Sequence, residues 1–278
     1  MSKLLRADLR RLFHSKVFWL CNIFLFAFSL YIVIDQAYEL KALNMPAYTD
    51  DCVGACGFFG VFALAVLCPS LIGTEYSDGT IRNKLICGHS RVSVYLANFL
   101  TTVIAGVIIL ALWVSSYLLL GVTIHECKAS ASVLAATVLG CVLELAAFAA
   151  VFTFMTMTIS NKVVNASLCI VLVLVLVFAA IFVAVSLQAP ETVSGYETNE
   201  SGEVTAAYDD PNPRYIAPDS GKRSVFEAVH MINPGNQALE LAGIALPEYV
   251  MHMCVYDVCL IAVFCFAGCL IFRKRDVR

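Results

Sequence analysis

Residues Val164–Leu187, VNASLCIVLVLVLVFAAIFVAVSL, indicate the fold class of this chain most clearly. It contains no Asp, Glu, Lys or Arg. A helix rises about 1.5 Å per residue, so about 20 apolar residues cross the roughly 30 Å hydrocarbon core of a membrane. Five further stretches are long and apolar enough to do the same, and they are Val17–Ile34, Val53–Gly73, Val94–Val122, Ala131–Ile159 and Val250–Phe272. We therefore predict an all-α integral membrane protein with six transmembrane helices.

The overall composition is typical of such a protein. Of the 278 residues, 60% are hydrophobic and 14% are charged, and the mean hydropathy is +0.82. Soluble domains are about 45–50% apolar and about 25% charged. The chain has too little charge to cover a soluble globule, which argues against a soluble enzyme and a disordered chain. Its net charge of −3 gives no reason to expect a nucleic-acid partner.

Lys and Arg are concentrated on one side of the six predicted spans. Six crossings place both termini on the same side of the membrane. The segments on that side hold thirteen Lys and Arg, whereas the opposite loops hold five basic and fifteen acidic residues. The first set is 1–16, 74–93, 160–163 and 273–278, and the second is 35–52, 123–130 and 188–249. Short loops rich in Lys and Arg stay in the cytoplasm, so we predict that both termini are cytoplasmic.

The segments divide the chain into four predicted parts. Residues 1–16 include SKLLRADLRRLFHS, in which Leu residues recur at helical spacing with Lys and Arg on the other face. This pattern predicts an interfacial amphipathic helix on the cytoplasmic surface, although a positive flank that only fixes topology is the alternative. Residues 17–187 hold transmembrane helices one to five, 188–249 form an extracellular segment, and 250–278 hold helix six and a basic cytoplasmic tail.

The loop after the second span, GTEYSDGTIRNKLICGHSR at residues 73–91, predicts a short helix. Ser77 or Asp78 can cap its N-terminus, and Gly88 can end it in the left-handed conformation. Its apolar side consists of Ile81, Leu85 and Ile86. A helix of two or three turns is not stable alone, so we expect it to lean on another part of the protein.

The extracellular segment 188–249 has two halves. The first, through about Ser220, is rich in Pro, Gly and acids, which predicts loops or small hairpins. The second, Val225–Ala245, predicts two helices separated by a break at Asn233-Pro234-Gly235. About sixty residues are marginal for an independent core, so we expect this segment to pack on the ends of the spans. Several of its apolar residues are expected to dip into the outer leaflet.

The sequence contains no motif that indicates catalysis. It lacks the GxxxxGK[ST] phosphate-binding loop, the HExxH zinc motif and the GxSxG nucleophile motif, so we predict no catalytic residue and no metal site. Two acids, Glu144 and Asp257, lie inside spans. Such acids are costly and often functional, so they are candidates for a polar substrate path or a proton relay. The alternative is a structural acid that faces the bundle.

The twelve cysteines are mostly inside spans, where they serve as small apolar packing residues. Four of them lie near the outer face, and whether they form a disulfide stays open. They are Cys52, Cys56, Cys127 and Cys254.

Taken in order along the chain, these features resemble the permease subunits of bacterial type-2 ABC exporters. A basic amphipathic helix precedes the first of six spans, and the second span runs into Ile72–Leu85, with an acidic, Gly-Thr, basic and Leu pattern. A polar break, Ser160-Asn161-Lys162, separates spans four and five. Ile232-Asn233-Pro234 resembles the family's Asn-Pro before an outer helix.

The resemblance implies a transport subunit of the bacterial plasma membrane that is not an enzyme. The loop at about 74–91 is then a coupling helix that docks on a separate ABC ATPase subunit, which binds ATP and Mg²⁺, whereas this chain binds no cofactor. A second permease chain, identical or related, completes the substrate path within membrane lipid. The residues implied to face the ATPase are Glu75, Tyr76, Asp78, Gly79, Thr80, Arg82 and Asn83.

The residues are also compatible with two other classes of function. An integral-membrane enzyme or protease would use Glu144, Asp257 or a His, and it would need two polar groups at one depth. A membrane sensor or immunity protein would bind a ligand with its outer segment. The substrate, the direction of transport and the identity of the second permease chain are not determined by these residues.

Overall fold

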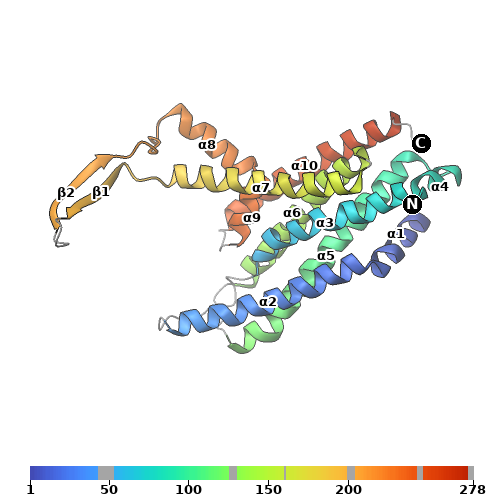
Figure 1. Cartoon of the computed structure of the whole chain (residues 1–278), viewed down its shortest axis with the longest axis horizontal. Coiled ribbons are helices and arrows are strands. Elements are labelled where there is room, and N and C mark those ends of the chain that lie inside the picture. The colour runs from blue at the N-terminus through green and yellow to red at the C-terminus, as the bar shows by residue number, and fades with distance from the viewer. Residues whose placement is uncertain (43–52, 125–129, 160, 199–203, 243–246, 275–278) are drawn as a thin grey trace.

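The computed structural model describes all residues except 43–52, 125–129, 160, 199–203, 243–246 and 275–278. Within the described residues, six helices are long and apolar enough to cross a membrane, as predicted. They are α2 (Lys16–Ala42), α3 (Ala55–Ser77), α5 (Arg91–Ile124), α6 (Ala131–Thr158), α7 (Lys162–Leu187) and α10 (Pro247–Lys274). They run side by side as one bundle (Figure 1). The predicted all-α membrane fold is confirmed.

The two ends of the bundle carry different structures (Figure 1). At one end lie the helix α1 (Ser2–His14), the short helix α4 (Thr80–Ile86) and the last turn of α10. We call this the α4 end. At the other end a two-stranded hairpin projects from the bundle, and we call this the hairpin end. The predicted interfacial helix and the predicted short helix therefore both form, and they lie at the same end.

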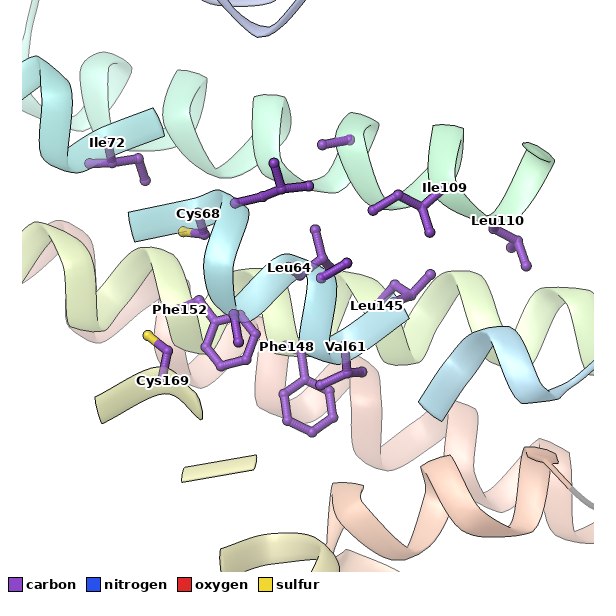
Figure 2. Packing of buried hydrophobic residues seen from close by; sticks show 14 of the residues in the cluster. Val61, Leu64, Cys68, Ile72, Ile109, Leu110, Leu145, Phe148, Phe152 and Cys169 are labelled. Atoms are coloured by element: carbon purple, nitrogen blue, oxygen red, sulfur yellow. The ribbon is translucent and has the colours of Figure 1, made fainter. Parts of the chain in front are cut away.

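Helix α3 forms the centre of the packing, with α5, α6 and α7 around it. Most of its residues from Cys56 to Glu75 are buried. Val61, Leu64, Cys68 and Ile72 among them recur every three or four positions, so they form a continuous apolar stripe along the helix. Figure 2 shows this stripe between α5 on one side and α6 on the other. The buried residues labelled there include Val61, Leu64, Cys68 and Ile72 of α3, Ile109 of α5, and Leu145, Phe148 and Phe152 of α6.

The segment between α7 and α10 contains the hairpin and two helices. Strands β1 (Thr192–Thr198) and β2 (Val204–Pro211) pair in antiparallel register, with Thr192 opposite Pro211. The helices are α8 (Gly221–Ile232) and α9 (Pro234–Ala242). The predicted hairpin and the predicted break between two helices are both confirmed.

The break at Asn233-Pro234-Gly235 is attached to the side of α7. Asn233 Nδ2 donates to the carbonyl oxygen of Leu176 at 3.0 Å, and Asn233 Oδ1 accepts from the backbone N–H of Gly235 at 2.9 Å. Gly235 has no Cβ, which lets its backbone lie against that of Leu176. Leu176 precedes the end of α7 by eleven residues, about 16 Å of helix. This segment therefore reaches along α7 instead of resting only on the ends of the spans.

Ten cysteines in the described residues are free thiols, and Cys56 and Cys254 are two of them. Cys52 and Cys127, the other two that could form an outer disulfide, lie outside the described residues.

Candidate functional site

Two glycines set the limits of α4. Gly79 occupies the N-cap with φ of +65°, a conformation that residues with a side chain rarely adopt, and its N–H donates to the Tyr76 carbonyl at 3.2 Å. No side chain caps this helix, so the predicted cap by Ser77 or Asp78 is wrong. At the other end Gly88 has φ of +85°, which confirms the predicted left-handed ending.

The carbonyls at the C-terminus of α4 are satisfied by a complete Schellman motif. The N–H of Gly88 donates to the Leu85 carbonyl at 3.0 Å, and the N–H of His89 donates to the Lys84 carbonyl at 3.3 Å. Ser90 then caps α5 by accepting from the N–H of Ser93 at 3.1 Å. The seven-residue helix therefore has a defined start and end, and the chain passes from it directly into a long span.

A buried network of charged side chains fixes α4 to three other helices. Lys84 Nζ of α4 lies 2.6 Å from Asp8 Oδ1 of α1 and 2.7 Å from Glu75 Oε1 at the end of α3. Arg11 of α1 forms an ion pair with the same Glu75 oxygen. Asn98 of α5 donates from Nδ2 to Glu75 Oε2 at 3.2 Å. Helices α1, α3, α4 and α5 therefore meet at one cluster, which we call the Lys84 network.

The Lys84 network is electrically balanced and shielded from water. It contains two acids, Asp8 and Glu75, and two bases, Arg11 and Lys84, and all but Arg11 are buried. Attraction between charges is stronger in a buried setting than at the surface, but an unpaired buried charge is costly. Each member therefore depends on its partners, and the network favours one arrangement of α1 against α4.

Two further contacts connect α4 and the end of α3 to the bundle. Ile81 of α4 is fully buried, which confirms part of the predicted apolar side. Tyr76 donates its hydroxyl to the Met157 carbonyl near the end of α6 at 3.0 Å. The short helix is thus supported from several sides, as its length requires.

The outward face of α4 is polar with one large apolar side chain. Asp78, Arg82 and Asn83 are exposed, and so is Ile86, with 73% of its surface accessible. The predicted apolar side is therefore wrong for Ile86. A groove runs between α1 and α4, and its lining includes Lys3, Ala7, Thr80, Asn83, Cys87 and His89. At the α4 end, an exposed helix face therefore lies beside a groove, and the Lys84 network holds this helix in place.

A family model described as "ABC-2 family transporter protein" matches residues 4–187. The matched region covers well over half of the chain and includes most of α1, all of α4 and the whole Lys84 network. The chain belongs to the ABC-2 transporter permease family. No curated protein matches it. Membership of the ABC-2 family makes the chain a transport subunit that is not itself catalytic, and permeases of this family work with an ABC ATPase subunit.

In this ABC-2 permease, the seven residues that the resemblance assigned to the ATPase contact differ in how far they are exposed. Asp78, Arg82 and Asn83 are exposed, and Gly79 and Thr80 are partly exposed. Tyr76 is half-buried and bonded to α6, and Glu75 has 2% of its surface accessible inside the Lys84 network. Glu75 therefore supports α4 from within this chain. Whether any of the seven contacts an ATPase stays a prediction.

Sequence reasoning missed four members of the Lys84 network, namely Asp8, Arg11, Lys84 and Asn98. For two of these residues the sequence does indicate burial. Asp8 lies on the same helical stripe as Leu4 and Leu12, and Lys84 follows Ile81 by three positions. Both charges therefore lie on faces that the apolar residues mark as buried, where they need partners.

The two intramembrane acids of the permease are both buried. Glu144 of α6 is fully inaccessible and Asp257 of α10 is 1% accessible, so both acids lie inside the bundle. Their two helices, α6 and α10, pack against each other. Glu144 Oε2 fills the space where Gly57 of α3 lacks a Cβ. Within the described residues neither oxygen of Glu144 has a hydrogen-bond partner, and no group of three or more His, Cys, Asp and Glu is suited to a metal ion.

Proposed function

We propose that this chain is the permease of an ABC exporter in a bacterial plasma membrane, with its α4 end in the cytoplasm. The charge distribution supports this orientation, because the segments at that end hold thirteen Lys and Arg against five in the opposite loops. A separate ABC ATPase subunit, which binds ATP and Mg²⁺, docks on this end. Export and not import is the expectation for the family that the chain resembles.

The observation that carries this proposal is the Lys84 network behind an exposed helix. A force applied to Arg82, Asn83 or Ile86 reaches Lys84 within one turn of helix. Lys84 then transmits it to Asp8 of α1 and Glu75 of α3, without a flexible loop between. Helix α4 therefore acts as the coupling helix, and α1 moves with it.

The proposal is tested first by reversing a charge on the outward face. Arg82→Glu is expected to weaken association with the ATPase subunit by about tenfold or more, because a like-charge contact is strongly unfavourable at an interface. The permease itself should fold normally, since Arg82 is exposed and belongs to no ion pair in the described residues. The measurement is co-purification of the ATPase subunit together with permease-dependent ATP hydrolysis in proteoliposomes.

Arg273→Glu is the matched control for this test. Arg273 is an exposed arginine at the same end, in the last turn of α10, and it lies outside α4. Its reversal should leave association unchanged. Equal ATPase binding by wild type and Arg82→Glu would remove α4 as the docking helix, and equal losses in both variants would indicate a general charge effect.

Two such permease chains pair around the substrate path in this proposal, because six spans are half of a usual exporter. The path uses the buried acids Glu144 and Asp257, which lie on two helices that pack closely, α6 and α10. An acid buried without a hydrogen-bonding partner is costly in a membrane, which argues that it is retained for a purpose.

Glu144→Gln is expected to reduce transport several-fold while protein level and thermal stability are preserved. The amide keeps the shape of the carboxyl group but cannot carry charge or exchange a proton. The measurement is ATP-dependent efflux of a panel of cationic compounds and peptides from cells, with surface expression checked in parallel. Unchanged efflux with unchanged expression would assign Glu144 to packing against Gly57 alone.

A further inference from the structure

A pocket of about 540 Å³ lies at the hairpin end, between the last turns of α7, the turn at 213–217 and the start of α8. The network at the α4 end and the buried acids do not contribute to it. Its walls are partly aromatic and partly basic, and its lining includes Phe182, Arg214, Tyr215, Ser220, Lys222 and Phe226.

The charge of this pocket is opposite to that of the segment that builds it. Residues 188–249 hold ten acids and three basic residues. Two of these three, Arg214 and Lys222, line the pocket, and no acid among the described residues lines it. Within the described residues, neither side chain forms an ion pair. The pocket therefore concentrates positive charge that is not neutralised by the protein around it.

The third basic residue, Arg223, holds the wall of the pocket in place. Its Nε forms an ion pair with Glu227 at 3.0 Å within α8, and it donates to the Ile216 carbonyl at 3.2 Å. Ser220 caps α8 by accepting from the N–H of Arg223 at 3.3 Å. The turn that carries Arg214 is thereby attached to the helix that carries Lys222.

The apolar wall lies at the depth where hydrocarbon gives way to headgroups. Phe182 of α7 and Phe226 of α8 are neighbours, with ring centroids 6.2 Å apart. Phe182 precedes the last residue of α7 by five positions, about 8 Å of helix. Since α7 spans the membrane, the aromatic wall lies near the acyl chains and the basic residues lie beyond it.

The exposed face of α8 is suited to contact with lipid. Val225, Val229 and Ile232 are exposed and recur at i, i+4 and i+7, so they form an apolar stripe that no described residue covers. The start of the same helix is polar, with Lys222, Arg223 and Ser224. Because α8 runs along α7 toward Leu176, its polar start lies at the interface and its apolar stripe is among acyl chains. The occupant of the adjacent pocket is therefore a lipid and not a molecule dissolved in water.

We propose that this pocket binds the headgroup of an anionic phospholipid from the leaflet at the hairpin end. Arg214 and Lys222 contact the phosphate and the headgroup charge, and Phe182 and Phe226 contact the glycerol and the first acyl carbons. The first turn of α8 adds its helix dipole, which favours an anion at its N-terminus. The proposal needs only that α7 spans the membrane, so it stands apart from the proposed transport function.

The test uses the purified full chain in mixed micelles with an acyl-labelled fluorescent phosphatidylglycerol, and the matching phosphatidylcholine for comparison. Wild type is expected to bind phosphatidylglycerol more tightly. Arg214→Gln combined with Lys222→Gln is expected to lower that affinity by about 30-fold, since each basic group near anionic lipid contributes about a factor of five. Binding of phosphatidylcholine should not change.

Lys41→Gln provides the matched control, because Lys41 is exposed in the last turn of α2 at the hairpin end and lies outside the pocket. It should bind phosphatidylglycerol like wild type. Equal binding of the two lipids, or equal losses in Lys41→Gln and the double variant, would overturn the proposal. The charge-conserving pair Arg214→Lys and Lys222→Arg should keep the preference, which excludes a folding defect as the cause.

Soluble glycerol 3-phosphate distinguishes a lipid site from a phosphate site. It carries the same phosphate chemistry without acyl chains, so it should fail to displace the labelled lipid at equal concentration. Phe182→Ala should weaken lipid binding while leaving the basic residues in place. Displacement by glycerol 3-phosphate, together with normal lipid binding by Phe182→Ala, would show a site for a free anion and contradict the lipid assignment.

Discussion

Lys84→Met is expected to destabilise the permease by about 3–5 kcal/mol, the cost of removing one partner from a buried ion pair. Glu75 keeps Arg11 and Asn98 after this change, but Asp8 loses the ammonium group that lies 2.6 Å from it. Asp8 is then a buried carboxylate without a compensating charge. The measurement is thermal or denaturant unfolding of the purified chain in detergent, with the position of α1 followed by a probe on its exposed face.

A second substitution tests whether the loss of stability comes from the unpaired charge of Asp8. Adding Asp8→Asn to Lys84→Met removes the uncompensated charge and leaves Glu75 paired with Arg11, so the double variant should be more stable than Lys84→Met alone. Arg82→Met, two positions away and exposed, should change stability by no more than about 0.5 kcal/mol. If Lys84→Met behaved like Arg82→Met, the Lys84 network would not hold α4 in place.

Gly79→Pro should abolish coupling to the ATPase while the six spans still insert. Gly79 has φ of +65°, whereas the proline ring requires about −65°, and proline lacks the N–H that Gly79 donates to Tyr76. The start of α4 must therefore move, at a cost of about 3 kcal/mol or more. The measurement is ATPase association and permease-dependent ATP hydrolysis, with membrane insertion checked by accessibility of an engineered tag.

Milder substitutions at the same position should give a graded response. Gly79→Ala places a Cβ in the left-handed region at a cost of about 1–2 kcal/mol, and Gly79→Asn should cost less because asparagine tolerates this conformation. A Cβ at this position would meet no atom within 4 Å, so we expect backbone conformation to set the order. Coupling should fall from Asn to Ala to Pro. Normal coupling in Gly79→Pro would refute the idea that this turn positions the docking helix.

Local features of the sequence predict much of the fold because they depend on short stretches of chain. A membrane span needs only enough consecutive apolar residues to cross the hydrocarbon, and all six spans follow from that count. Gly88 predicts the end of α4 because its left-handed conformation is intrinsic to glycine. The break at Asn233-Pro234-Gly235 is similarly local, since proline cannot continue the hydrogen bonding of α8.

The candidate site could be only partly predicted from the same residues. The exposed positions Asp78, Arg82 and Asn83 were assigned to a docking face by resemblance, and their side chains are exposed in this chain. Glu75 belongs to the same polar loop by sequence, but it is turned inward. Hydropathy cannot distinguish an exposed charged residue from a buried one, because its value for a residue is the same whether the side chain faces water or a buried partner.

The six spans, the unequal distribution of charge and the short helix between spans two and three all follow from the order of amino acids along the chain. Which charges are buried depends instead on how the helices pack, because Asp8 and Lys84 are separated by 76 positions and meet only when α1 folds against α4 and α5. Glu144 and Asp257 are likewise distant in the chain, and both are buried through the packing of their helices, α6 and α10. Burial and pairing of charge are properties of the packed helices, because they depend on residues that are distant in the chain and meet only in the folded bundle.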